Sequence, residues 1–408
     1  MPQKKSYLRL IIVSIIVVNL SISCDSDDES LIDDNPVIEE KLVSTDLVTT
    51  TPSSTLQLAL IFADINLDPQ EFQYAVDLYR ITYRTNYKGE EITASGLIAI
   101  PQTDDQLDVI SVHHGTIGSD AEAPSNLATT DSFVFLIQAV ASAGFVAIAP
   151  DFIGFGSSSE IMHPYYVEAL TATSILDNIT AGLEFADQLE LNVNQNLFLA
   201  GYSQGGYATM AAHKYIEENN LADFGLIASF PASGGYDLKG FQEIIFDLET
   251  YHQPFYLAYI SHAYQTAFDF SQPLSLLFNE PYASDIPTLF DGSNTGEQIN
   301  EQLTDDLSEL LTTGFLSGID TDTEYQFIAN ALVENSLLNW TPTIPLYMYH
   351  GDADITVPYQ TSVDTYNKLI ENGASAEIIS FTNLEDKNHS TGLIPYIEQF
   401  VPVLLDLR

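Results

Sequence analysis

The chain has 408 residues, of which 45% are hydrophobic and 11% aromatic, so a disordered polymer is excluded. Its 57 Asp and Glu residues outnumber 12 Lys and Arg residues, which gives a formal net charge of −45. Such a chain repels phosphate backbones and carries no basic stripe, so we do not expect it to bind nucleic acid. We interpret the acidity as a device for solubility.

The first 23 residues differ in composition from the rest of the chain. Lys4, Lys5 and Arg9 precede the apolar run LIIVSIIVVNL at residues 10–20, a pattern typical of a signal peptide. The run is shorter than the roughly 20 apolar residues that a membrane-spanning helix needs. A retained anchor is therefore the less favoured interpretation, and we expect residues 1–23 to be removed on export.

Cys24 is the only cysteine of the chain, so an intramolecular disulfide is excluded. Small residues before a lone cysteine, directly after an apolar run, resemble the cleavage site of bacterial lipoproteins, which implies that Cys24 carries the lipid. The acidic residues at 25–29 resemble a surface-export tag, so the expected location is the cell surface, anchored to the bacterial outer membrane. The alternative is ordinary cleavage nearby, with Cys24 as a free thiol. We interpret residues 24–42 as an acidic flexible tether.

Strand-forming residues dominate from residue 76 onward. VDLYRITYRTNY (76–87) and EEITASGLIAIP (90–101) meet at the turn KGE, which predicts an antiparallel hairpin. Apolar runs at 107–115, 145–150 and 196–201 then alternate with helical patterns near 130–142, 166–188 and 204–219. Continuous apolar strands joined by helices predict a parallel sheet that is buried on both faces.

This alternation breaks from about Pro231 to Trp340, where several helix-length amphipathic pieces occur, including residues 241–248, 256–268 and 305–319. It resumes with IPLYMYHGD at 344–352, a helix near 358–371, a strand at 376–382 and a helix near 392–406. An interruption between two strands of one sheet is an inserted lobe. We therefore expect residues 43–408 to form one domain with a helical cap.

GYSQG at residues 201–205 fits G-x-S-x-G between a predicted strand and a predicted helix, the context of a nucleophile elbow. In that tight turn the serine backbone is strained, and neighbours two positions away must lack side chains so that strand and helix can approach. We therefore predict that Ser203 is a nucleophile. The alternative is a plain glycine-rich turn.

A serine nucleophile needs a base and an acid that orients the base. His389 lies in a polar loop after the last predicted strand, where this order of elements would deliver the base. His213 is expected on the surface of the helix after the elbow. Asp352 and Asp354 both follow the strand that begins near Pro345, and both qualify as the acid by position.

The chain order Ser203, Asp354, His389 matches that of α/β-hydrolases, and HGDADITVP resembles the H-G-x-x-D-x-x-V-P acid motif of that superfamily. The resemblance selects Asp354 as the acid and leaves Asp352 as a loop cap or a solvated carboxylate. GFVAIAPDFIGFGSS, GYSQGG and the helical insert also resemble the secretory lipase and esterase group. This implies an α/β-hydrolase fold, with a mostly parallel central sheet flanked by helices and a cap insertion at about 231–340.

The resemblance also implies two backbone donors for an oxyanion. One is the N–H of Gln204, directly after the nucleophile, and the other is the N–H of Thr116 in the loop HHGT. Gly115 remains an alternative to Thr116. His113 and His114 are expected to be structural, because an oxyanion is received by amides.

These observations predict a serine hydrolase that cleaves carboxylic esters, as a lipase or carboxylesterase, through an acyl-enzyme on Ser203. A serine peptidase or an acyltransferase would share the same residues, but residues 42–75 offer no room for the propeller of prolyl peptidases. A non-catalytic surface lipoprotein would be expected to have lost one of the three residues. No metal-binding signature occurs, so we expect no metal and no cofactor, and we expect a monomer.

Overall fold

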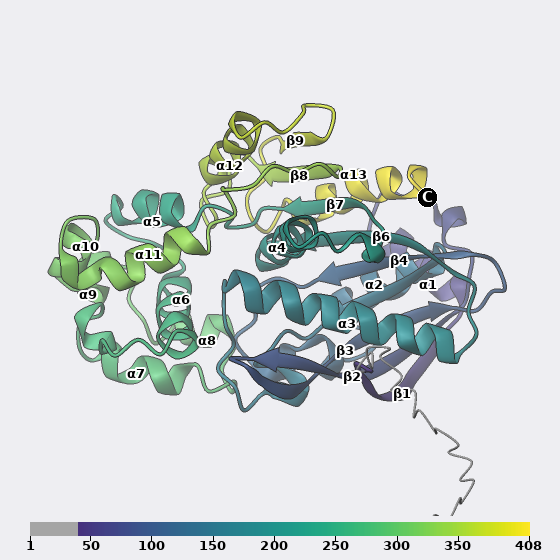
Figure 1. The fold of residues 1–408 in the computed structure, drawn as a ribbon, viewed down its shortest axis with the longest axis horizontal. Helices are drawn as coiled ribbons and strands as arrows, with labels where there is room; N and C mark the ends of the chain where they lie inside the picture. Colours follow the sequence, from purple (N-terminus) through teal and green to yellow (C-terminus); the bar gives the residue numbers. More distant parts are fainter. Residues whose placement is uncertain (1–39) are drawn as a thin grey trace, which may run out of the picture. The chain divides into compact units, whose positions relative to one another are not determined.

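The computed structural model describes residues 40–408 (Figure 1). Cys24, the predicted signal peptide and the predicted tether up to residue 39 lie outside the described residues. Among the described helices, none combines the length and apolarity that crossing a membrane requires.

The centre of the fold is a nine-stranded sheet in the order β1-β2-β3-β5-β4-β6-β7-β8-β9. Pairing is antiparallel from β1 to β5 and parallel from β5 to β9. This confirms the predicted hairpin and the predicted mostly parallel sheet. The strands are β1 (Leu42–Thr51), β2 (Val76–Tyr87), β3 (Glu90–Pro101), β4 (Leu107–His113), β5 (Phe145–Pro150), β6 (Val193–Tyr202), β7 (Leu226–Ala232), β8 (Leu346–Gly351) and β9 (Ile379–Leu384).

Helices cover both faces of the sheet, and α3 and α4 cross the front face in Figure 1. The helices are α1 (Ser53–Phe62), α2 (Ser132–Ser142), α3 (Glu168–Gln188), α4 (Gln204–Glu218), α5 (Leu238–Phe246), α6 (Pro254–Ala267), α7 (Tyr282–Leu289), α8 (Gly296–Asn300), α9 (Leu307–Leu310), α10 (Thr313–Gly318), α11 (Gln326–Glu334), α12 (Tyr359–Glu371) and α13 (Leu393–Asp406).

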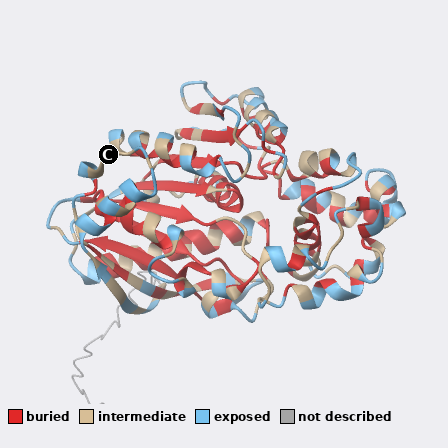
Figure 2. Cartoon of the chain, turned by 180° about the vertical axis from the view of Figure 1, so that it is seen from behind, coloured by how far each residue is buried: buried red, intermediate tan, exposed pale blue. Residues whose placement is uncertain are grey.

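The core has a layer on each face of the sheet. In β6, Phe198 and Ala200 pack with α1, α2 and α13, whereas Leu197 and Leu199 pack with α3 and α4 on the opposite face. Successive strand side chains point to opposite faces, so a strand that is apolar at every position serves both layers. Figure 2 shows these central strands as almost entirely buried.

The sequence did not predict two elements at the N-terminal edge, the strand β1 and the helix α1. β1 pairs along the outer side of β2, and its first residue, Leu42, falls within the predicted tether. The backbone N–H of Leu42 donates to Glu184 of α3 at 2.7 Å, which joins this end of the tether to the fold. The strand has little apolar periodicity, because much of this edge strand faces solvent.

The inserted lobe lies between β7 and β8 and consists of α5 to α11, the cap at the left of Figure 1. Its predicted limits, Pro231 and Trp340, lie within a few residues of the ends of these two strands. The helix expected over 305–319 is instead two short helices, α9 and α10. The break follows from the Thr312 side chain, which accepts from the Phe315 N–H and so starts a new helix.

Candidate active site

Ser203 occupies the turn between β6 and α4 in a strained backbone conformation, with φ 59° and ψ −124°. A side chain on Gly201 would overlap the Gly205 carbonyl, and one on Gly205 would overlap the His113 carbonyl. A side chain on Gly206 would overlap the Ala232 carbonyl. The three glycines therefore allow the strand and helix to approach closely enough to present Ser203 at the end of the sheet.

The structure brings Ser203, His389 and Asp354 together in one hydrogen-bonded chain. His389 Nε2 lies 2.8 Å from Ser203 Oγ, and His389 Nδ1 lies 2.7 Å from Asp354 Oδ2. The three residues come from the end of β6, the loop after β9 and the loop after β8. A base in hydrogen-bond contact with a serine hydroxyl, itself oriented by a carboxylate, is the arrangement that activates a serine.

Asp354 has further partners that hold its carboxylate in place. Its Oδ1 accepts from the backbone N–H groups of Thr356 and Val357 at 2.9 and 3.0 Å, and Oδ2 lies 3.1 Å from Nε2 of the buried His350. Burial alone would raise the pKa of Asp354, but the hydrogen bonds from His350 and His389 outweigh burial and hold this pKa well below its usual range. The carboxylate therefore stays charged beside His389.

The sequence did not assign a role to His350, although it is the first residue of HGDADITVP. Its Nε2 lies 3.1 Å from Asp354 Oδ2 and 3.0 Å from the Val357 carbonyl oxygen, and because both of these atoms are acceptors, Nε2 carries a proton and donates it toward Asp354. Its Nδ1 lies 2.6 Å from the Ser362 hydroxyl. Because His350 and Asp354 belong to the same short motif, the motif itself could have indicated the contact between them.

Asp352, the other carboxylate that qualified by position, is exposed and bonds to β9 and the loop after it. Its Oδ1 accepts from the Asp386 N–H at 2.7 Å, and its Oδ2 accepts from the Asn383 side chain at 2.9 Å. It holds the loop that precedes His389 and makes no hydrogen bond to His389 itself.

Of the two predicted oxyanion donors, Gln204 directly follows Ser203, and Thr116 follows Gly115, where an added Cβ atom would lie 3.7 Å from Ser203 Cβ. Within the described residues, the backbone N–H groups of Gln204 and Thr116 have no hydrogen-bond partner. His114 Nδ1 lies 2.7 Å from the Gly115 carbonyl oxygen. In a trans peptide the C=O and the next N–H point in opposite directions, so this bond turns the Thr116 N–H away from His114.

The Gln204 side chain is fixed by a second buried histidine. Gln204 Nε2 lies 2.7 Å from His163 Nε2, and His163 Nδ1 donates to the Ile153 carbonyl at 2.6 Å. Burial lowers the pKa of His163 to about 3, so the ring is neutral and its Nε2 accepts from Gln204. Gly154 touches the His163 backbone so closely that a side chain there would overlap it.

His213 and His113 have structural roles. The prediction that His213 lies on the surface was wrong: it is fully buried, lies 2.7 Å from Glu217 and packs edge-on against Trp340 at the end of the insert. The returning end of the insert covers this side of α4, which the helix sequence alone does not reveal. His113 bonds to Thr209 and Ser111, and burial lowers its pKa to about 3.

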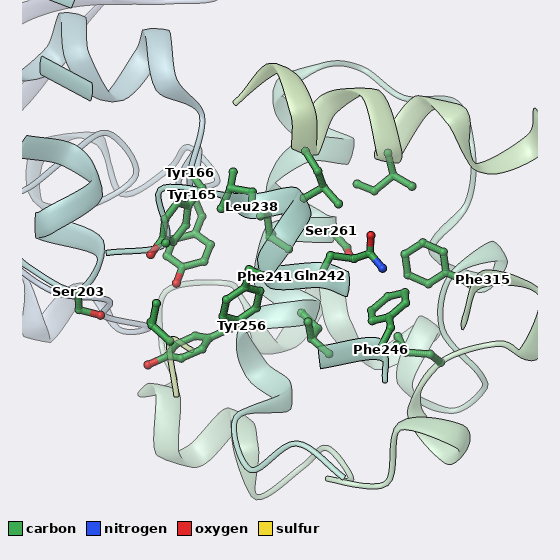
Figure 3. Close-up of a pocket in the computed structure, with 17 residues that line it drawn as sticks. Tyr165, Tyr166, Ser203, Leu238, Phe241, Gln242, Phe246, Tyr256, Ser261 and Phe315 are labelled. Atoms are coloured by element: carbon green, nitrogen blue, oxygen red, sulfur yellow. The ribbon is translucent and has the colours of Figure 1, made fainter. Parts of the chain in front are cut away.

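A narrow apolar pocket extends from Ser203 into the cap; we call it the cap pocket (Figure 3). Its cavity volume is about 60 Å³, and Ser203 lies at one end with Phe315 at the other. Most of the walls come from cap helices, including Leu238 and Leu332. Such a passage is suited to an unbranched hydrocarbon chain.

Comparisons with known proteins find relatives among lipases and other hydrolases. A secreted triacylglycerol lipase of Malassezia furfur is 22% identical over 356 residues, which are 81% of this chain and 63% of that protein. This chain thus spans less than two thirds of that relative. The solved structure of a hydrolase candidate from Legionella pneumophila is 25% identical, with a TM-score of 0.80, and the match covers 90% of this chain and 98% of that chain.

The rice cell wall degrading esterase LipA from Xanthomonas oryzae shares the fold, with 23% identity, a TM-score of 0.77 and coverage of 90% of this chain and 97% of that chain. The family profile of the alpha/beta hydrolase fold matches residues 108–382, more than half of the chain. These residues include Thr116, Ser203 and Asp354, which the fold brings to one end of the sheet. The chain belongs to the alpha/beta hydrolase fold family.

Proposed function

We propose that the protein is a serine hydrolase that cleaves carboxylic esters, as a lipase or carboxylesterase, through an acyl-enzyme on Ser203. The observation that supports this most directly is the hydrogen-bonded chain from Ser203 through His389 to Asp354. Similarity to a secreted triacylglycerol lipase and to a cell wall degrading esterase supports esters as the substrate class of this protein.

In this reaction His389 Nε2 takes the proton as Ser203 Oγ attacks the ester carbonyl carbon. The N–H groups of Gln204 and Thr116 receive the oxyanion of the tetrahedral intermediate. The C–O bond to the alcohol then breaks, the alcohol oxygen takes the proton from His389, and the acyl group stays on Ser203 Oγ. Water, activated by His389, releases the acid and restores the hydroxyl.

The acyl chain of the substrate would occupy the cap pocket. Ser203 is at the pocket's entrance, and beyond it the walls are mainly leucine, isoleucine, phenylalanine and tyrosine side chains. Burial raises the pKa of Tyr256 to about 12, so this wall stays uncharged. A fatty acyl chain fits these properties better than a polar acyl group.

A fluorophosphonate label, which modifies activated serines, tests the proposal when combined with a panel of acyl esters and peptide amides. Wild type should label and hydrolyse esters, while Ser203→Ala should lose both, with activity falling by several orders of magnitude. Ser390→Ala is the matched control, because Ser390 is exposed and adjoins His389. Full labelling of Ser203→Ala, or hydrolysis of amides alone, would contradict the proposal.

We also propose that the protein is exported, anchored to the outer membrane through a lipid on Cys24, and active as a monomer. The support for the anchor is the sequence pattern around residues 4–29. Cys24→Ala should move the protein from the membrane fraction to the soluble fraction. A mutant that stays membrane-bound would instead indicate an uncleaved apolar run.

A further inference from the structure

A second cavity, larger than the cap pocket, lies beside the nucleophile elbow, where Gly201 and Tyr202 line it. It is bounded by α1 and the loop after it, α2, α13 and the ends of β4 and β6; we call it the core cavity. Its volume is about 310 Å³, roughly five times that of the cap pocket. Protein interiors leave few voids larger than one water molecule, so a gap of this size between the sheet and its helices requires an explanation.

The walls of the core cavity are mainly apolar, and their polar side chains besides two tyrosines are His113, His114 and Ser132. The apolar residues include Leu136 and Ala139 of α2, and Ile394 and Ile397 of α13. The two tyrosine hydroxyl groups have partners outside the cavity: that of Tyr202 donates to the His389 carbonyl at 2.8 Å, and that of Tyr396 donates to the Phe230 carbonyl at 2.6 Å. An apolar cavity holds water poorly and binds hydrocarbon, so its ligand is an apolar group.

The inner end of the core cavity reaches the reaction centre. Gly115 and Tyr202 line it and flank Ser203. A Cβ atom built on Gly115 would lie 3.7 Å from Ser203 Cβ, and the centroids of the Tyr202 and His389 rings are 5.5 Å apart. The cavity therefore lies next to both the nucleophile and the base, although Ser203 itself opens into the cap pocket.

Apolar side chains that line or adjoin the core cavity are in contact with solvent at two places. Near His389, Leu393 and Ile394 of the first turn of α13 are 39% and 38% exposed. At the outer end, away from His389, Phe62 at the end of α1 adjoins the lining residue Ala63 and is 84% exposed. The lining of the core cavity therefore reaches solvent at α1 as well as beside His389.

The chemistry of ester cleavage fixes where the acyl half and the alcohol half of a substrate lie relative to Ser203 and His389. The acyl half stays on Ser203, and the alcohol oxygen must lie where His389 can return the proton. Tyr202 and the first turn of α13 adjoin His389, and both belong to the core cavity. Resting on the proposed ester hydrolysis, we propose that the core cavity binds the apolar alcohol part of the substrate.

The substrate class that follows is an ester with hydrocarbon on both sides of the carboxyl group. The narrow cap pocket takes an unbranched acyl chain, and the wider core cavity takes a bulkier apolar alcohol, such as a long-chain or cyclic alcohol. Esters of polar alcohols would leave the core cavity empty.

Two ester series test this assignment. One keeps the acyl group as butanoyl and lengthens the alcohol from propyl to octyl, while the other keeps a propyl alcohol and lengthens the acyl chain. Alkyl alcohols of this range are similar leaving groups, so the slope of kcat/KM against alcohol length reports binding. In wild type we expect kcat/KM to rise with alcohol length by up to about fourfold per methylene.

Two variants fill the core cavity: Ala139→Phe at depth and Ala63→Trp at the exposed outer end. Both should flatten the alcohol series while the acyl series keeps its slope. Leu332→Trp, which fills the cap pocket, should flatten the acyl series while the alcohol series keeps its slope. Ala128→Trp, on an exposed loop before α2, is the matched control for Ala63→Trp and should change neither slope.

The outcomes separate this inference from the proposed function. If wild type hydrolyses esters but shows no dependence on alcohol length, or if both filling variants keep the wild-type alcohol slope, the core cavity is not the alcohol site and ester hydrolysis still stands. If Ser203 is not labelled and no ester is cleaved, the proposed function fails and the inference falls with it. Because Ala63 is exposed, Ala63→Trp gives an answer even if Ala139→Phe does not fold.

Discussion

The nucleophile elbow and the cap are held in place by different kinds of interaction. At the elbow, backbone meets backbone: Gly205 lies against the carbonyl groups of His113 and His114, and Ser203 adopts a positive φ of 59°. The cap has no ladder of paired strands among its described residues, only the isolated bridges Thr250–Asp306 and Phe278–Leu311. Its contacts are mainly between side chains, such as the pair Tyr259 and Phe290 with ring centroids 4.7 Å apart.

This difference separates two tasks. Reaction geometry must be held to within a fraction of an ångström, and backbone contacts that tolerate no added atom can achieve this. Substrate choice depends on the shape of a pocket, and a pocket built from side chains changes shape by substitution without disturbing the sheet. We therefore expect changes at the elbow to affect catalysis and folding, and changes in the cap to affect selectivity.

The largest effect should come from Asp354→Asn. The amide cannot hold the correct tautomer of His389 by accepting from Nδ1–H in the same way, and the equivalent change in a serine protease costs about 10⁴-fold in rate. Asp352→Asn is the matched control, because Asp352 is exposed and bonds to Asn383 and Asp386 but not to His389. Steady-state kcat on one ester measures both, and equal losses would reassign the acid.

The next effect concerns the oxyanion donor. Thr116→Pro removes the backbone N–H and should lower kcat by about 10²–10³-fold, as loss of one donor does elsewhere. Thr116→Val keeps the N–H and removes only the hydroxyl, which bonds Tyr165 at 2.9 Å. A thermal melt should establish that both variants fold. Similar kcat values in the two folded variants would transfer the donor role to Gly115.

A pair of glycine substitutions compares the two regions directly. Gly205→Ala would overlap two backbone carbonyl groups and should destabilise the protein by about 1–3 kcal/mol or more. In Gly318→Ala the new methyl would meet the Asp322 carboxylate, which is exposed and can rotate away, and would lie 3.2 Å from the Tyr325 ring, which must shift by a few tenths of an ångström. Denaturant unfolding should therefore show a smaller loss of stability for Gly318→Ala than for Gly205→Ala. If the cap variant lost as much stability, the cap would be as tightly constrained as the elbow.

The smallest expected effect is the change in kcat/KM for each methylene added to the acyl chain. For wild type, kcat/KM should rise with acyl length by up to about 0.8 kcal/mol per methylene, because each added methylene is buried in the cap pocket. Leu332→Trp should flatten this rise, whereas Val333→Trp, on the exposed side of α11, should leave it intact. A preference of wild type for acetyl esters would contradict the role of the cap pocket.

Short-range patterns account for what could be predicted. Strands that are apolar at every position, such as residues 145–150, and helices that directly follow them are encoded by local periodicity, so β5 and α4 were placed to within two residues. The loop that carries Asp354 meets the loop that carries His389 in the fold, and this meeting could be predicted only because the motif around Asp354 resembles that of a known superfamily. Where periodicity is weak, prediction failed: β1 and α1 were missed, and α9 and α10 were merged into one helix.

The sequence by itself determined the order of elements and the residues that could carry chemistry, because glycine spacing, strand composition and the motif around Asp354 act over a few residues. Only the tertiary structure decided that His350 supports Asp354, that His213 is buried under Trp340, and that an apolar cavity lies beside the elbow. Each of these depends on which surfaces of separate elements meet, and burial is a property of that packing, so no local pattern along the chain encodes it.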